Sequence, residues 1–247
     1  MQVTNIIAAF IFLVAALAAG IASVTGFGIG SLLTPVLSLQ APLKVAVAIV
    51  SVPHLIGTAI RFWMLRGHVD RRVIVTFGVA SAVGGLTGAL LHARLGSPVL
   101  SAVFGGLLLF VAITQFTGAA ERMRFGGPVA MGAGALSGLL GGLVGNQGGI
   151  RSAGLLGFDM PKETFVATAT AIGLMVDAAR MPVYVATEGH EMAQFGPAVV
   201  TAIAGVVVGT VAGARVMRRV PERWFRTIVA SILAVLGAGM VIQAWRS

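Results

Sequence analysis

Long apolar runs separated by short polar stretches make up nearly the whole chain. Each long run approaches the ~20 residues that a helix needs to cross the apolar core of a bilayer. These runs cover approximately residues 4–25, 43–64, 73–92, 98–117, 128–145, 163–186, 196–214 and 226–243. The pattern predicts an all-α, polytopic membrane protein that forms one integral membrane domain.

Two further apolar runs, 29–39 and 150–158, are too short to cross a membrane. Each follows a glycine cluster and ends before a proline. The clusters are GFGIG at 26–30 and GNQGG at 145–149, and the prolines are Pro42 and Pro161. Because glycine and proline interrupt regular backbone, we predict a broken helix at each position.

The two breaks belong to a repeated pattern. An offset of 119 residues superposes the two glycine clusters and places Arg61 on Arg180. Arginine is rare inside apolar runs, so this match is more specific than the glycine matches. The sequence therefore predicts a duplication, with a first membrane repeat in 1–118 and a second in 119–247.

Basic residues are distributed differently in equivalent loops of the two repeats. The loop near 66–72 contains three arginines, whereas its counterpart near 187–195 contains two glutamates and no lysine or arginine. The next pair reverses, because the loop near 93–97 has one arginine and that near 215–226 has five. Basic loops stay on the cytoplasmic side, so the repeats are predicted to be inverted.

Inverted repeats require an odd number of crossings in each half. We therefore predict that runs 4–25 and 29–39, and likewise 128–145 and 150–158, each form a re-entrant helical hairpin followed by three transmembrane helices. The N-terminus is then outside, and the basic loop near 118–127 is inside. The alternative is a set of ordinary spans with weak charge bias, since run 4–25 is long enough to cross fully.

Composition excludes several other classes of protein. The chain is 57% hydrophobic and 10% charged, and its basic residues lie in clusters between apolar runs, so the net charge of +9 indicates membrane topology rather than nucleic-acid binding. It has no cysteine, which removes disulfides and thiolate chemistry. No catalytic or metal-binding motif is present. We expect no enzyme activity, no metal and no cofactor.

The two breaks are the predicted substrate site. A short helix after a glycine break has unpaired N–H groups at its start, and these groups and the helix dipole attract anions. Inverted halves would bring both breaks together near the middle of the membrane. The expected substrate-binding residues are Gly26, Gly28, Gly30, Ser31, Thr34, Asn146, Gln147, Gly148, Gly149, Arg151 and Ser152. Alternatively, the glycines only permit close helix packing.

Arg151 is the expected main contact to the substrate. It follows the second glycine cluster, where its charge adds to the positive end of a helix, so an anion should offset it. The alternative is that Asp177 neutralises Arg151 from another helix.

Four more ionisable residues within apolar runs are candidates for coupling or gating, because burying such groups is costly. They are His54, Arg61, Asp177 and Arg180. Asp177 and Arg180 are three residues apart and can pair on one helix face. The alternatives are a purely structural Asp–Arg pair, arginines that reach the membrane surface, and a histidine that hydrogen-bonds into a proline kink.

Both breaks resemble known signatures. The segment GFGIGSLLTPVLSL at 26–39 is similar to the N-terminal signature of the TauE/SafE sulfite exporter family. The segment GGLVGNQGGIRSAGLLGFDMPKETFVATATAIGLMVDAARMPVYV at 141–185 is similar to the second-half signature of one branch. The matching residues are Gly26, Gly28, Gly30, Pro35, Gly148, Gly149, Arg151, Asp177 and Arg180. The first signature departs from the family at Phe27 and Ile29, where members are often richer in glycine.

The resemblance implies a multi-pass carrier in the inner membrane for small sulfur-containing or organic anions, such as sulfite or sulfonates. We expect a secondary transporter that works by alternating access, in the direction of export, with a proton as a candidate coupling ion. The alternatives are an uptake carrier, an anion-selective pore, or a membrane assembly partner that transports nothing. The sequence leaves open whether the protein is a monomer or a homodimer.

Overall fold

The computed structural model describes residues 2–119, 128–217 and 222–246, and within these ranges the regular secondary structure is entirely helical. The α-helices are α1 (Gln2–Thr25), α2 (Ile29–Leu37), α3 (Leu43–Leu65), α4 (Arg71–Val73), α5 (Val79–Arg94), α6 (Ser97–Thr117), α8 (Pro128–Val144), α9 (Gly148–Leu155), α10 (Lys162–Gln194), α11 (Gly196–Met217) and α12 (Glu222–Arg246). A short π-helical segment, Ile74–Gly78, joins α4 to α5. The predicted all-α class is confirmed.

Six helical segments in the described part of the chain are long and apolar enough to cross a membrane. They are Asn5–Thr25, Leu43–His68, Arg71–Arg94, Ser97–Thr117, Lys162–Gln194 and Thr227–Trp245. The segment in α1 is therefore long enough to cross alone, whereas Val129–Val144 of α8 and Gly196–Ala212 of α11 are shorter apolar helices. The breaks appear at both predicted places, where α2 and α9 are too short to span.

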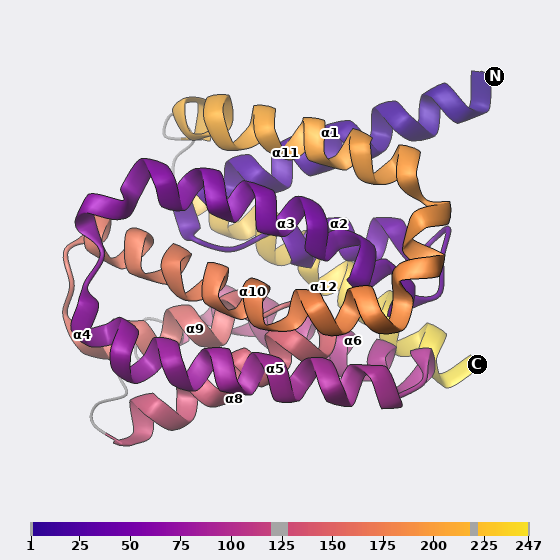
Figure 1. The fold of residues 1–247 in the computed structure, drawn as a ribbon. Helices are drawn as coiled ribbons and strands as arrows, with labels where there is room; N and C mark the ends of the chain where they lie inside the picture. The colour runs from indigo at the N-terminus through magenta and orange to yellow at the C-terminus, as the bar shows by residue number, and fades with distance from the viewer. Residues whose placement is uncertain (1, 120–127, 218–221, 247) are drawn as a thin grey trace.

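The helices lie roughly along one direction (Figure 1). Helices α3 and α10 pack against each other in the middle, α1 and α11 pair along one flank, and α5 and α8 pair along the other. Helices α6 and α12 also pair. Both termini lie at the same end of the molecule, and α3 and α11 finish at the opposite end (Figure 1).

Glycines allow the paired flank helices to approach closely. A Cβ atom on Gly88 of α5 would collide with the carbonyl oxygen of Leu139 on α8. A Cβ atom on Gly209 of α11 would collide with the carbonyl oxygen of Ala16 on α1. Small residues at helix interfaces are typical of membrane proteins, where dispersion contacts between backbones drive association.

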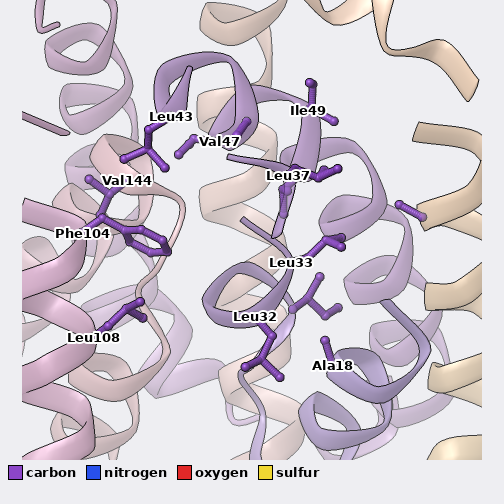
Figure 2. Close-up of a cluster of buried hydrophobic side chains, with 14 of the residues drawn as sticks. Ala18, Leu32, Leu33, Leu37, Leu43, Val47, Ile49, Phe104, Leu108 and Val144 are labelled. Carbon is purple, nitrogen blue, oxygen red and sulfur yellow. The ribbon is translucent and has the colours of Figure 1, made fainter. Parts of the chain in front are cut away.

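The half-helix α2 lies inside the protein. Figure 2 shows Leu32, Leu33 and Leu37 of α2 among the buried side chains of neighbouring helices, which include Ala18 of α1 and Phe104 of α6. A broken helix is tolerated at membrane depth only where its free backbone groups face protein or a wet cavity. The packing of α2 meets this requirement.

The predicted loop near 187–195 is wrong, because α10 continues through Gln194. Glu188 and Met192 in this segment are both buried, so packing on one face sustains the helix although its sequence is polar. Arg122 and Arg124 of the basic loop near 118–127, and Arg218 and Arg219 of the loop near 215–226, lie outside the described residues.

Candidate anion site

The two breaks have the same backbone conformation at positions that correspond under the offset of 119 residues. Gly26 and Gly145 have positive φ angles of 82° and 74°, a conformation that glycine adopts without steric cost. The half-helices then start at N-cap residues Gly28 and Gln147, and neither start has a side-chain capping hydrogen bond. The N–H groups of both first turns are therefore available to other partners.

The structure brings the two breaks into direct contact. A Cβ atom on Gly30 of the first break would collide with the carbonyl oxygen of Gly145 in the second. Likewise, a Cβ atom on Gly148 would collide with the side chain of Phe27. The starts of α2 and α9 thus face each other across the core, although they are more than a hundred residues apart in the chain.

Arg151 lies where the two breaks meet. Its side chain is 3% exposed, and its Nη2 donates a hydrogen bond of 2.7 Å to the carbonyl oxygen of Gly26. Its Nη1 lies beside Gly173 of α10, where a Cβ atom would be only 2.9 Å away. Its Nε and Nη1 have no hydrogen-bond partner within the protein. Most of the donor capacity of a buried guanidinium is therefore free for a ligand.

Other polar groups around the breaks are also buried without a protein partner. These atoms are Thr34 Oγ1, Asn146 Nδ2, Gln147 Nε2 and Oε1, and Ser152 Oγ. Ser31 is buried as well, at 3% exposed. Unpaired buried polar groups are rare in native proteins, so a group of them at one place indicates a site that receives a partner from outside.

Asp177 joins two of the predicted coupling residues. Its Oδ2 lies 2.7 Å from Nδ1 of His54 on α3, and its Oδ1 lies 2.8 Å from Nη2 of Arg180. Arg180 also donates a 2.6 Å hydrogen bond from Nη1 to the carbonyl oxygen of Gly141, just before the second break. Both oxygens of Asp177 are therefore engaged by residues other than Arg151. The suggested structural Asp–Arg pair is present, and it includes His54.

Arg61 lies inside the protein rather than on its surface. Its side chain is 4% exposed, and its Nε donates a 3.1 Å hydrogen bond to Oγ1 of Thr170 on α10. Its Nη1 has no hydrogen-bond partner within the protein. Packing against α10 holds the guanidinium inside.

The buried charges of this region do not balance. Among the described residues, three buried arginines (Arg61, Arg151 and Arg180) face one buried aspartate, Asp177. The remaining buried carboxylate, Glu188, pairs with Lys44 at 3.3 Å. With His54 uncharged, the cluster has an excess of two positive charges. Burying an unpaired charge costs several kcal/mol, so this region is suited to an anion.

Three residues of α10 in this arrangement were not predicted. Thr170 binds Arg61, Gly173 makes room for Arg151, and the buried Tyr184 donates a 2.5 Å hydrogen bond to the carbonyl oxygen of Gly142. Together with Asp177 and Arg180, they recur at intervals of three and four residues, which places them on one helix face. That spacing is the signal in the sequence that could have identified them.

Helices of membrane-spanning length surround this buried, positively charged cluster, as in an integral membrane protein. A family model described as "Sulfite exporter TauE/SafE" matches residues 11–240, and the chain belongs to this family. The protein is therefore a membrane transporter of sulfite-like anions and not an enzyme. Comparison with curated proteins found no match. Comparison with solved structures found none either.

Proposed function

We propose that this protein is a secondary transporter that exports a small sulfur-containing or organic anion, of the sulfite or sulfonate type, across the inner membrane by alternating access. The observation that carries the proposal is the position of Arg151. Its buried guanidinium lies at the contact between the two breaks, with free donor atoms and no carboxylate within 4 Å among the described residues.

The proposed binding mode combines one charge with two helix starts. The planar guanidinium of Arg151 matches the oxygens of a sulfonate, sulfite or carboxylate group. First-turn N–H groups of α2 and α9 add further donors, and both helix dipoles favour a negative charge at this place. The hydrogen bond from Arg151 to the carbonyl oxygen of Gly26 orients the guanidinium relative to the first break.

The packing supports inverted halves. The equivalent helices α3 and α10 run antiparallel, because Lys44 pairs with Glu188 whereas Arg61 pairs with Thr170. The pairing of α1 with α11 corresponds, after exchange of the halves, to that of α8 with α5. In transporters of this kind, one half rocks against the other around a central site.

The two ends of the α3–α10 pair are joined differently, which supports alternating access. At one end, Lys44 binds Glu188 at 3.3 Å and also donates a 2.8 Å hydrogen bond to the carbonyl oxygen of Ala93. At the other end, the ring of His68 lies 3.8 Å from Glu163, and both side chains are largely exposed. The first end is closed by buried polar contacts, and the second is only loosely joined. We infer that the conformation described here is closed at the Lys44 end.

The positions of the arginines indicate which end of the protein faces the cytoplasm. Helix α3 ends on the side of the molecule opposite to both termini (Figure 1). Three arginines come directly after this end, namely Arg66, Arg71 and Arg72. The positive-inside rule places that end in the cytoplasm and both termini outside. The Lys44–Glu188 pair would then be the external closure. The His54–Asp177 pair is the proposed carrier of a coupling proton.

A counterflow assay in proteoliposomes tests the function. Vesicles loaded with unlabelled sulfite should accumulate external labelled sulfite through the wild-type protein, which a carrier does and a pore or an inert partner does not. Arg151→Gln should lose this uptake at low substrate concentration. Arg66→Gln, which removes an exposed arginine, is the matched control and should behave as wild type. Uptake without counterflow would indicate a pore and contradict the carrier mechanism.

Cysteine labelling tests the inverted arrangement, and the chain contains no native cysteine. His68→Cys and His190→Cys each place a thiol on an exposed position. We expect a membrane-impermeant maleimide to label them from opposite sides of the membrane. Labelling from the same side would refute the inverted halves without affecting the anion site.

A further inference from the structure

We propose that Arg61 is a second anion-binding residue, and that Arg61 and Arg151 together select a doubly charged small oxyanion over a singly charged one with a similar head group. This inference rests on the proposed transport function and concerns the same site. It assigns a binding role to Arg61, which the sequence suggested only for coupling or gating.

Arg61 of α3 and Arg151 of α9 contact α10 at positions one turn apart, Thr170 and Gly173. Arg151 lies beside Gly173, and a Cβ atom there would also be 3.6 Å from Cγ2 of Thr58. Arg61 follows Thr58 by one turn on α3 and binds Thr170, which precedes Gly173 by one turn on α10. One small ligand can therefore interact with both.

Among the described residues, no carboxylate lies within 4 Å of the guanidinium of Arg61. Its hydrogen bond to Thr170 uses only Nε, and the hydroxyl of Thr170 donates its own proton to the carbonyl oxygen of Val166. Nη1 of Arg61 is buried and has no hydrogen-bond partner. A neutral hydroxyl leaves the charge of the guanidinium in place, so a purely structural role for Arg61 does not explain its burial.

The neighbouring carboxylate is already committed. Asp177 is bound by Arg180 at 2.8 Å and by His54 at 2.7 Å. It balances the charge of Arg180, and the charges of Arg61 and Arg151 remain. A singly charged ligand would offset one of these two charges, whereas a doubly charged ligand would offset both. The gain in attraction is large because the site is shielded from water.

Two probes of fixed charge separate these cases. Sulfate carries two negative charges near neutral pH, and methanesulfonate carries one on a similar group of sulfur-bound oxygens. We would measure the affinity of both by calorimetry at constant ionic strength, with the full-length protein in lipid nanodiscs. Wild type should bind sulfate at least tenfold more tightly than methanesulfonate.

The variants assign the preference to Arg61. Arg61→Gln should weaken sulfate binding about tenfold and methanesulfonate binding about twofold, so that the preference disappears. Arg61→Lys retains the charge and should keep part of the preference, which also guards against a folding defect in the glutamine variant. Arg151→Gln should weaken both probes. Arg66→Gln, at an exposed position, should change neither.

The outcomes distinguish this inference from the function on which it rests. Equal affinity of wild type for both probes, or an unchanged sulfate preference in Arg61→Gln, would overturn the role of Arg61 and leave the anion site standing. Failure of wild type to bind either probe would overturn the anion site, and this inference with it.

Discussion

The two helix breaks have a common backbone but different side chains. Gly26 and Gly145 both have positive φ angles, and each break leads into a half-helix without a side-chain cap. The first cluster interposes Phe27 and Ile29 between its glycines, whereas the second contributes Asn146 and is followed by Arg151. The first break thus contributes mainly backbone groups, and the second contributes the charge.

The helices that follow the breaks, α3 and α10, also differ in their charged residues. Under the offset of 119 residues, Arg61 of α3 corresponds to Arg180 of α10, and Thr58 corresponds to Asp177. Only the second half therefore has the carboxylate, and Arg180 is neutralised while Arg61 is not. The two breaks thus share their backbone geometry, whereas the charges on the helices that follow them differ. We infer that an anion contacts the two halves unequally.

The largest expected effect concerns the carboxylate that only one half contains. Asp177→Asn should abolish transport driven by a pH gradient and leave part of the exchange of substrate for substrate, because exchange needs no net proton movement. Both activities are measured in the same proteoliposomes, so retained exchange reports a folded protein. Glu191→Gln, at an exposed position of α10, is the control. Undiminished gradient-driven transport in Asp177→Asn would restrict Asp177 to a structural role.

The next effect concerns the backbone contact that both breaks share. Gly30→Ala places a methyl group against the carbonyl oxygen of Gly145, so we expect a loss of about 1–3 kcal/mol in the free energy of unfolding. Gly132→Ala in α8 faces open space and should be neutral or slightly stabilising. Thermal melting of the two purified variants measures the difference. Equal melting temperatures would mean that the breaks do not pack tightly.

A smaller effect is expected for the charge of the second break. Arg151→Gln should fold, reach the membrane and lose anion affinity by about tenfold or more, which corresponds to about 1.4 kcal/mol. Arg151→Lys should recover only part of it, because lysine lacks the planar fork. Direct binding of labelled sulfite measures both.

Combining Arg151→Gln with Asp177→Asn separates binding from structure. Because Asp177 contacts His54 and Arg180 rather than Arg151, the double variant should be no more stable than Asp177→Asn alone. Restored stability would identify the two residues as partners, and normal anion affinity in Arg151→Gln would refute its binding role.

The smallest effects should distinguish neutral polar groups of the two breaks. Asn146→Leu removes a buried amide from the second break, and Thr34→Val removes a buried hydroxyl from α2. We expect about a threefold loss of anion affinity for the former and less than twofold for the latter, because the second break provides more of the contact. A larger loss of affinity in Thr34→Val would mean that the first break provides more of the contact to the anion.

Local patterns were sufficient to predict much of the fold. Runs of apolar residues located the helices, and the glycine clusters at 26–30 and 145–149 located both breaks, because backbone interruption depends on the residues at that point. His54, Arg61, Asp177 and Arg180 became candidates because ionisable groups are costly in apolar helices. Arg151 became one because it follows a glycine break at the start of a helix. The end of α10 was misplaced, since burial of Glu188 and Met192 depends on neighbouring helices.

Only the tertiary structure decided how these residues pair. Sequence left Asp177 with two potential arginine partners. It pairs with Arg180 one turn away on α10, and the packing of α3 on α10 adds His54. The packing of α3 on α10 also inserted Arg61 beside Thr170, and the packing of α9 on α10 placed Arg151 beside Gly173. Composition and spacing determined which charges enter the membrane. Which of them remain unneutralised depends on contacts between residues distant in the chain, and these form only when the helices pack.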